Sequence, residues 1–419
     1  MPEVPVQVFG LSVSQSRCSR VPRIWYRETR GGSSRDFVIA TATAASALTT
    51  AGFHVKHSKP PAAVPTCQAI AGFVDNKCSR PLKAPDGLNA PTLFTTFTCE
   101  FLFLTMVRGN PVVVPSKRGK RMHSIDSNAC VLALSPDQEP RLHVESGDEV
   151  TVRTLDCFSN TITDESQLFS TVGWDKVNPA TGPIAVNGAR PGDTLKVEIL
   201  SIEVGEQATM TTHPDFGALP GTVEERTRIV PIRDGKAQFS DDITIPIRPM
   251  IGVIGTAPAS ESVPTGEPRQ HGGNMDTKEI VAGSTLYLPV EVDGANLSLG
   301  DVHAVMGDGE VAVCGAEIEA EVKIRVTVLE GRPLPLPFLD SGDAVYAISS
   351  EIELMDAVKE STRMMRDWLV SVSALDATDA LMLLSLVGDT QISQIVDPRM
   401  TARFRLPKTI LKQCGVELP

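Results

Sequence analysis

From residue 121 onward, short runs of alternating apolar and polar residues recur along the chain. Gly, Pro, Asn and Asp punctuate the runs, and each run has the five-to-ten-residue length typical of a β-strand. The runs fall within the segments 141–157, 182–204, 243–255 and 284–292, with turn residues between them. Strand signals at such regular spacing favour a β-sandwich or a β-barrel.

The clearest strand follows Gly315. Even positions from Ile318 to Val328 are apolar, whereas odd positions from Glu317 to Thr327 are polar. Because successive side chains of a strand point to opposite faces, this pattern predicts a strand with one buried and one wet face.

The pattern changes near the C-terminus. Apolar residues at 352, 355, 358, 365, 369 and 372 have helical spacing, and 378–386 indicates a second helix with Asp379 in its first turn. A strand over 391–396 and a Pro-bounded tail follow. The predicted fold class is therefore β-dominated α+β: a sandwich or barrel-like core over 121–330 and a smaller α+β part over 331–415.

Residues 1–120 form an atypical basic extension with poor hydrophobic periodicity. Their net charge is +9, against −21 for the rest of the chain. Arginines precede a small-residue apolar run over 37–53, as in transit peptides and signal sequences, but acidic residues interrupt the pattern. Four explanations stay open: a poorly ordered extension, an incorrectly assigned start of the protein, a targeting segment, or a real domain.

Composition narrows the function classes. With 42% apolar residues and 32 glycines among 419, the chain can bury a sizeable core. Its net charge of −12 argues against nucleic-acid binding, which requires a basic face, and no apolar stretch is long enough to span a membrane. Only Cys157, Cys314 and Cys414 follow Cys130, and they lie far apart in the sequence. A disulfide framework is therefore not expected, and we expect this part of the protein to reside in a reducing compartment.

Two glycine-punctuated segments concentrate the candidate chemistry. The segment HGGNMDTKE contains His271, Asn274 and Asp276, and its two glycines allow close approach of the backbone to a ligand. Asn274 and Asp276 are two residues apart and so share one side of an extended loop. Imidazole and carboxylate groups suit zinc, whereas carboxylate and amide oxygens suit calcium.

The second segment, GDVHAVMGDGEVAVCGAEIE, spans 300–319. Asp301 and His303 share one strand face, and Glu310 follows a Gly-Asp-Gly turn. A parity break at Gly315 indicates a bulge that would re-aim Glu317. Taken alone, this spacing is only moderately specific: a lone strand histidine is more often structural.

These segments resemble those of the acetamidase/formamidase family, specifically its acetamidase branch. The resemblance covers about 121–415 and rests on IPIRPMIGVIGTAP (245–258), HGGNMDTKEI (271–280), STLYLPV (284–290), GDVHAVMGDGEVAVCGAEI (300–318) and SLVGDTQISQIVDP (385–398). It implies a cytoplasmic homo-oligomeric hydrolase that converts acetamide or formamide to a carboxylate and ammonia. It also implies a divalent metal ion, zinc or calcium.

Carried onto this sequence, the resemblance implies a converging set of side chains. His303, Asp301 and Asp156 are expected to hold the metal ion, with His271 as a possible fourth ligand. Asp276 is a further expected ligand. Glu317 or Glu310 is the expected general base. Asn274 and the backbone N–H groups of Gly272 and Gly273 are expected to bind the substrate amide or the developing oxyanion.

Two alternatives stay open. In the first, a non-catalytic β-sandwich protein uses the same residues to hold a structural ion. In the second, Cys314 is the nucleophile of a thiol amidase, although a reactive thiol requires a base or a positive neighbour. A histidine beside the carboxylates favours the metal-assisted hydrolase over a purely structural calcium site, which would use only oxygen ligands.

Overall fold

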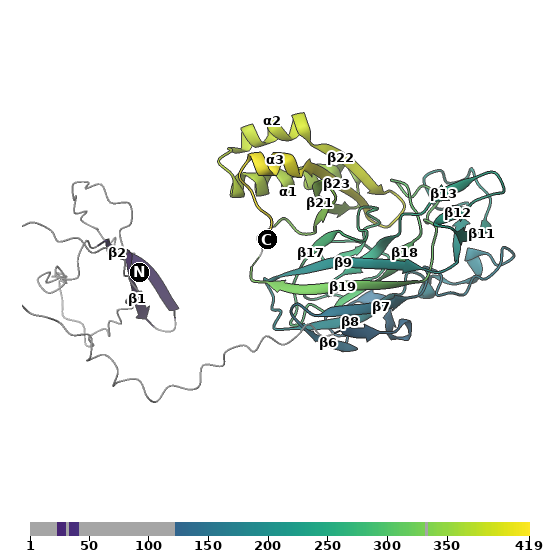
Figure 1. Ribbon diagram of the computed structural model, residues 1–419, viewed down its shortest axis with the longest axis horizontal. Helices are drawn as coiled ribbons and strands as arrows, with labels where there is room; N and C mark the ends of the chain where they lie inside the picture. The colour runs from purple at the N-terminus through teal and green to yellow at the C-terminus, as the bar shows by residue number, and fades with distance from the viewer. Residues whose placement is uncertain (1–22, 31–32, 42–121, 332–333) are drawn as a thin grey trace, which may run out of the picture. The chain divides into compact units, whose positions relative to one another are not determined.

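The computed structural model describes residues 23–30, 33–41, 122–331 and 334–419 (Figure 1). The chain divides into two compact units, Met1–Asn110 and Pro111–Pro419. In the first unit, β1 (Arg23–Arg30) pairs with β2 (Ser33–Thr41) in antiparallel fashion. Apart from this pair of strands, the predicted basic extension over 1–120 lies outside the described residues.

A nine-stranded sheet runs through the second unit. Its strands, in spatial order, are β22 (Asp389–Gln394), β23 (Met400–Pro407), β21 (Ala344–Glu351), β20 (Phe338–Ser341), β17 (Thr285–Pro289), β9 (Thr194–Val204), β19 (Ala320–Leu329), β7 (Glu149–Thr154) and β3 (Met122–Ile125). All neighbours are antiparallel except β3 and β7. The alternation predicted over 318–328 is confirmed as β19, in which Val322, Ile324 and Val326 are buried.

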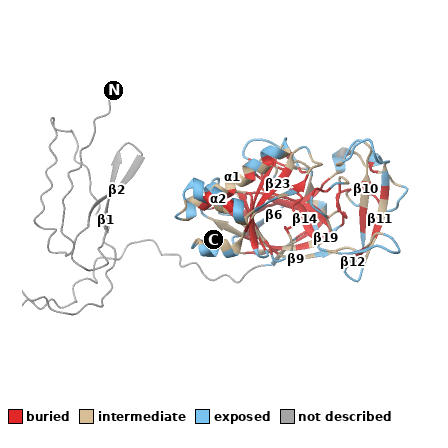
Figure 2. Ribbon diagram, turned by 90° about the horizontal axis from the view of Figure 1, so that it is seen from above, coloured by how far each residue is buried: buried red, intermediate tan, exposed pale blue. Residues whose placement is uncertain are grey.

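A second sheet packs against this one. It consists of β16 (Gly272–Asn274), β14 (Met250–Gly255), β18 (Leu297–His303), β8 (Ala180–Asn187) and β4 (Cys130–Val131), with β6 (Leu142–Glu145) also paired to β8. One apolar cluster joins the two sheets, since Ile254 and Leu299 from the second sheet share it with Val197 and Ile324 from the first. Figure 2 shows strands of this core, among them β14 and β23, coloured largely as buried. The predicted β-sandwich core is therefore confirmed.

Smaller sheets complete the β-rich part. One consists of β10 (Gln207–Thr212), β11 (Arg226–Arg233), β12 (Lys236–Gln238) and β13 (Thr244–Pro246), and the other of β15 (Val263–Pro264) and β5 (Ala133–Leu134). The loop that follows β10 contacts the loop that follows β18. The N–H of Ala218 in the first loop donates to the carbonyl of Val311 in the second at 2.9 Å.

The C-terminal part carries the helices, which are α1 (Leu354–Val372), α2 (Ala377–Val387) and α3 (Lys408–Gln413). Helix α1 packs on β21 and β23 through a separate apolar cluster that includes Trp368, Phe338 and Phe404 (Figure 1). Asp376 caps α2 by accepting from the N–H groups of Thr378 and Asp379. Both predicted helices and the strand near 391 are confirmed, and the strands of this part extend the nine-stranded sheet through β17 and β20.

Among the described residues, no helix has the length and apolarity that a membrane crossing requires.

Candidate active site

Strand β14 brings the two predicted segments together. It pairs with β16 on one side and with β18 on the other, so that Asn274 lies opposite Val253, and His303 lies opposite Met250. The 271–276 segment and the 301–303 segment are therefore neighbours across a single strand. The predicted convergence of these two segments is present in the fold.

A buried imidazole lies at the centre of the site. Nε2 of His303 lies 3.7 Å from Asp276 Oδ1, 3.6 Å from Asp301 Oδ2 and 3.2 Å from Glu317 Oε1. Glu310 Oε1 is 3.9 Å from the same nitrogen. These five side chains are all at least nine-tenths buried. One histidine and four carboxylates thus meet in the interior of the protein.

Three of these carboxylates depend on an unusual backbone. The φ angles are +41° at Asp276, +54° at Asp301 and +47° at Glu310, in the left-handed region that few residues other than glycine adopt. Such strain concentrates at functional sites, where the surrounding fold holds it in place. The backbone here is bent to aim the carboxylates inward.

Two glycines leave the room that the cluster occupies. A Cβ atom at Gly252 of β14 would overlap Asp276 Oδ1 and would lie 2.6 Å from Asp301 Oδ2. A Cβ atom at Gly315 would lie 2.6 Å from His303 Nδ1. The Gly315 N–H also donates to Glu317 Oε1 at 2.7 Å. The sequence predicted that Gly315 re-aims Glu317, and this hydrogen bond is the contact through which it orients the carboxylate.

The electrostatics of the cluster call for a cation. Burial raises the pKa of Asp276 to about 7, with Asp301 adding repulsion, and burial raises the pKa of Glu317 to about 8. Burial by itself favours neutral His303, but Glu317 and Asp301 raise the pKa of its ring well above the usual range. The carboxylates repel one another when ionised, and a cation bound among them would offset this repulsion.

Several polar atoms of the cluster have no hydrogen-bond partner. They are both carboxylate oxygens of Asp276, Oδ1 of Asp301, both ring nitrogens of His303 and Oε2 of Glu317. Unpaired buried polar atoms are costly and rare in folded proteins. The ligand atoms of Asp276, Asp301 and His303 all lie within 4.8 Å of one another, as do those of His303, Glu310 and Glu317. This donor set fits a divalent ion with mixed nitrogen and oxygen ligands.

Two predicted ligands do not join this group. Asp156 Oδ1 accepts from the N–H groups of Phe158 and Asn160, at 3.0 and 2.6 Å, and so organises the turn after β7. Burial raises its pKa to about 6, with Glu319 and Asp301 adding to the effect. It faces a separate hollow. The turn that Asp156 supports carries Cys157 into the cavity in its place.

His271 is the second predicted ligand outside the group. Its ring is buried, but it lines a different hollow together with Arg269, Glu351 and Arg399. Burial lowers the pKa of His271 to about 4, and Arg269 adds to the effect, so that the ring is neutral at pH 7. The residue precedes β16, and its ligand atoms do not group with those of the His303 cluster.

The structure also corrects the predicted roles of Gly272 and Gly273. Neither residue lines the cavity beside the cluster. The Gly272 N–H donates to the Arg269 carbonyl at 3.1 Å. A Cβ atom at Gly273 would lie 2.7 Å from the Glu267 carbonyl oxygen. These glycines therefore permit close packing of the backbone and the turn into β16, rather than contact with a substrate.

Asn274 does face the cavity. Its Nδ2 donates to Asp397 Oδ2 at 2.9 Å, whereas its Oδ1 is buried without a partner. Burial raises the pKa of Asp397 well above its usual range, and Asp276 adds repulsion. Sequence reasoning missed Asp397, which follows β22. The only signal was its position in the SLVGDTQISQIVDP motif.

A cavity of about 550 Å³ opens onto the cluster. Asp301, Glu310 and Glu317 form part of its wall beside Asn274 and Asp397. Cys157 also lines it, with Sγ 2.9 Å from Asn178 Oδ1, and its ligand atom groups with those of Asp301 and Glu317. Sequence reasoning missed this cysteine as well.

Cys314 is buried behind the wall of the cavity. Its Sγ donates to the Thr211 carbonyl at 3.3 Å and accepts from the Thr211 N–H at 3.1 Å. Burial raises the pKa of the Cys314 thiol to about 12, with Glu317 adding repulsion. A nucleophilic thiol needs a lowered pKa, whereas the pKa of this one is raised and its hydrogen bonds go to Thr211.

Comparison with known proteins identifies the family of the chain. The profile of the Acetamidase/Formamidase family matches residues 126–265 and 259–337. The crystal structure of an acetamidase from Bacillus halodurans is 44% identical, with a TM-score of 0.69 over 70% of this chain and 100% of that one. The chain belongs to the acetamidase/formamidase family. The family predicted from the sequence is therefore confirmed.

Other relatives extend the comparison. A predicted acetamidase/formamidase from Thermoanaerobacter tengcongensis is 42% identical, with a TM-score of 0.70 over 72% of this chain and 100% of that one. A formamidase from Methylophilus methylotrophus is 27% identical over an alignment of 257 positions that covers 46% of this chain. The matched region spans 63% of the length of that formamidase.

Proposed function

We propose that this protein is a metal-assisted amidohydrolase that cleaves the C–N bond of linear amides to give a carboxylate and ammonia. The observation that carries the proposal is the His303 cluster with its unpaired oxygen and nitrogen atoms at the wall of a cavity. Membership of the acetamidase/formamidase family supports the class of substrate.

In this proposal Asp276, Asp301 and His303 hold the divalent ion. When bound, such an ion supplies Lewis-acid polarisation of the amide carbonyl and acidification of water. Zinc and calcium both remain consistent with the ligand types, since the nitrogen of His303 suits zinc and the carboxylates suit either ion.

Glu317 is the proposed general base. It lines the cavity, and its Oε2 has no hydrogen-bond partner, while Gly315 holds its other oxygen in place. A base of this kind takes a proton from the attacking water and can return it to the leaving nitrogen. Glu310 lines the same wall and is the second candidate for this role.

Asn274 is the proposed binding group for the amide. Its buried Oδ1 can accept a hydrogen bond from the substrate NH₂ group, and Nδ2 retains a second N–H besides the one that Asp397 accepts. An N–H group aimed at the carbonyl oxygen stabilises the negative charge that develops there. Asp397 holds the side chain in the orientation that presents both groups.

The non-catalytic alternative is disfavoured by the cavity. A structural metal site is closed, with every position around the ion filled by the protein, whereas catalytic sites keep a position open to substrate. Here three carboxylates of the cluster face a space of about 550 Å³. Assembly into a homo-oligomer and a cytoplasmic location stay predictions.

The test is ammonia release from acetamide by the wild-type protein and by Glu317→Gln. We expect the substitution to lower kcat by about 10²–10⁴-fold, the usual contribution of a general base. Glu319→Gln is the matched control, because Glu319 is exposed and faces the separate hollow with Asp156. Unchanged turnover of Glu317→Gln would remove Glu317 from this role and transfer it to Glu310.

A further inference from the structure

The cavity beside the cluster is far larger than the amides that give the family its name. Acetamide has four non-hydrogen atoms and takes up on the order of 100 Å³, about three times the volume share of a water molecule. It would fill only about a fifth of a 550 Å³ space. Cavities of several hundred cubic ångströms are typical of sites for much larger ligands.

Part of the cavity wall is apolar. It is formed by Leu132, Phe158, Phe169, Val177, Phe216 and Val313. These side chains come from loops that follow β4, β7, β10 and β18, together with the short 3₁₀ turns between β7 and β8. The cavity thus combines an apolar surface with polar groups, which outside the cluster include Asp175, Asn178 and Thr265.

Aromatic packing holds part of this wall in place. The rings of Phe158 and Phe169 meet edge to face, with centroids 5.9 Å apart, and Phe169 packs against His213 at 6.2 Å. His213 in turn packs against Phe216, with centroids 4.7 Å apart. Phe158 and Phe169 belong to an apolar cluster with Cys157 and Ile162. The wall is therefore a preformed surface, which binds apolar groups without an added ordering cost.

The charges around the cavity select against anions. Among its described lining residues are six carboxylates and no Lys, Arg or His. Glu267, one of the six, already pairs with Arg269 and Arg399. A negatively charged acyl group would find no counter-charge here, whereas an uncharged hydrocarbon would find a complementary wall.

We infer that the preferred substrate is a primary amide whose acyl group is a sizeable uncharged hydrocarbon, such as hexanamide or phenylacetamide, rather than formamide or acetamide. This inference rests on the proposed function. The carboxamide would lie at Asn274 and the cluster, and the acyl chain would extend along Phe158, Phe169 and Phe216. Burial of each added methylene would raise kcat/KM about fourfold until the wall is covered.

The first test is the rate of ammonia release by the full-length metal-loaded protein from formamide, acetamide, butyramide, hexanamide, phenylacetamide and succinamate. We expect kcat/KM to rise at least tenfold from acetamide to hexanamide. We also expect a lower kcat/KM for succinamate, which carries a carboxylate, than for uncharged butyramide of the same chain length. A kcat/KM that falls from acetamide to butyramide to hexanamide would overturn this inference and leave the proposed function intact. No turnover of any amide would overturn both.

Two variants locate the acyl site. Gly266 lines the cavity without a left-handed φ, and a Cβ there would meet only Asn178 Nδ2 at 3.7 Å, so Gly266→Val adds volume without forcing the backbone. Phe216→Ala removes part of the wall. Each should lower the ratio of kcat/KM for phenylacetamide to that for acetamide by about tenfold. Leu386→Ala, at an 82% exposed position on α2, is the control and should leave the ratio unchanged.

Both kcat/KM values are measured on the same preparation of each variant. A smaller fraction of active protein lowers both values equally and leaves their ratio unchanged. Circular dichroism and the metal content of each variant establish that the cluster has formed. Unchanged ratios in both cavity variants would place the acyl group elsewhere and would overturn the assignment.

Discussion

Replacing Gly252 with alanine tests whether the cluster needs its present geometry. Gly252 lies on β14 between the two segments that supply the cluster, and its φ is outside the left-handed region, so alanine suits the backbone. The added Cβ would overlap Asp276 Oδ1, and it would lie 2.6 Å from Asp301 Oδ2 and 2.8 Å from the Asp301 carbonyl oxygen. One methyl group therefore displaces two proposed ligands at once.

The size of the effect follows from these contacts. Carbon and oxygen atoms approach to roughly 3.3 Å without strain, so each carboxylate must move by about 0.7 Å or more. A misplacement of about 1 Å in a catalytic constellation costs about 10²-fold in rate. Insertion of a methyl group into a packed core costs about 1–3 kcal/mol in the free energy of unfolding.

We therefore expect Gly252→Ala to lower kcat/KM for acetamide about 100-fold and to reduce the bound metal after dialysis. The assays are ammonia release, elemental analysis and urea unfolding. Gly307→Ala is the matched control, because a Cβ there meets no atom within 4 Å and the φ of Gly307 is not left-handed. Wild-type activity and wild-type metal content in Gly252→Ala would refute the claim that this geometry holds the ion.

Two further predictions concern stability. The pKa of His271 is about 4 in the fold and about 6.5 when unfolded, so on acidification the unfolded chain binds the proton first. The wild type should therefore lose about 2 kcal/mol of unfolding free energy between pH 7 and pH 5, as measured by urea titration. His271→Gln should not show this loss. Equal losses in both proteins would contradict this. Fully buried Arg403 pairs with Glu279 at 2.8 Å and Asp308 at 2.7 Å, so Arg403→Met should cost about 3–5 kcal/mol in unfolding free energy. Arg405→Met on the same strand, where the paired carboxylates are exposed, should cost about 1 kcal/mol or less; similar costs for both variants would refute the assignment.

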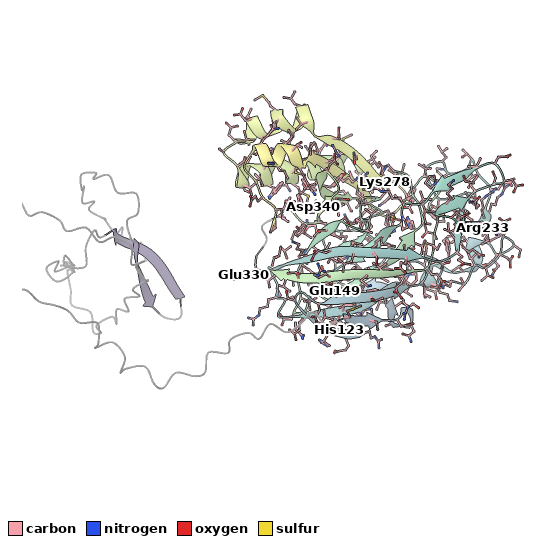
Figure 3. The ribbon with its side chains drawn as sticks, in the orientation of Figure 1. His123, Glu149, Arg233, Lys278, Glu330 and Asp340 are labelled. Carbon is pink, nitrogen blue, oxygen red and sulfur yellow. The ribbon has the colours of Figure 1, made fainter. Side chains whose placement is uncertain are left out.

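Arg403 also connects the C-terminal part to the site. Its Nη1 donates to the Ile392 carbonyl, and its pairing with Asp308 anchors the turn that leads to Glu310. Lys278, labelled in Figure 3, pairs with the other oxygen of Asp308 at 3.0 Å. The strands of the C-terminal part thus support one wall of the cluster, which explains why they extend the main sheet.

Local patterns predicted the fold well. Strict alternation after Gly315 identified β19, and helical spacing identified α1, because each element buries one continuous face. The meeting of the Asn274 segment and the His303 segment was also predicted. That β14 would be the strand between them depends on long-range pairing, which periodicity does not report.

The errors at the site have specific physical causes. Asp156 and His271 are the residue types that bind metal, but Asp156 accepts hydrogen bonds from a turn, and His271 lines a different hollow. Orientation of this kind depends on backbone angles such as the +54° φ of Asp301, which residue type does not reveal. Asp397 was missed because it comes from a strand end more than 90 residues further along the chain than His303.

The most direct test of the central claim is the rate of ammonia release from acetamide by the purified protein, measured before chelation, after removal of metal, and after stoichiometric return of zinc or calcium. If the His303 cluster holds an ion that the reaction needs, chelation should abolish turnover, and one of the two ions should restore it. Asp301→Asn should fail to recover under the same treatment. Undiminished turnover by protein shown to be free of metal would contradict the account.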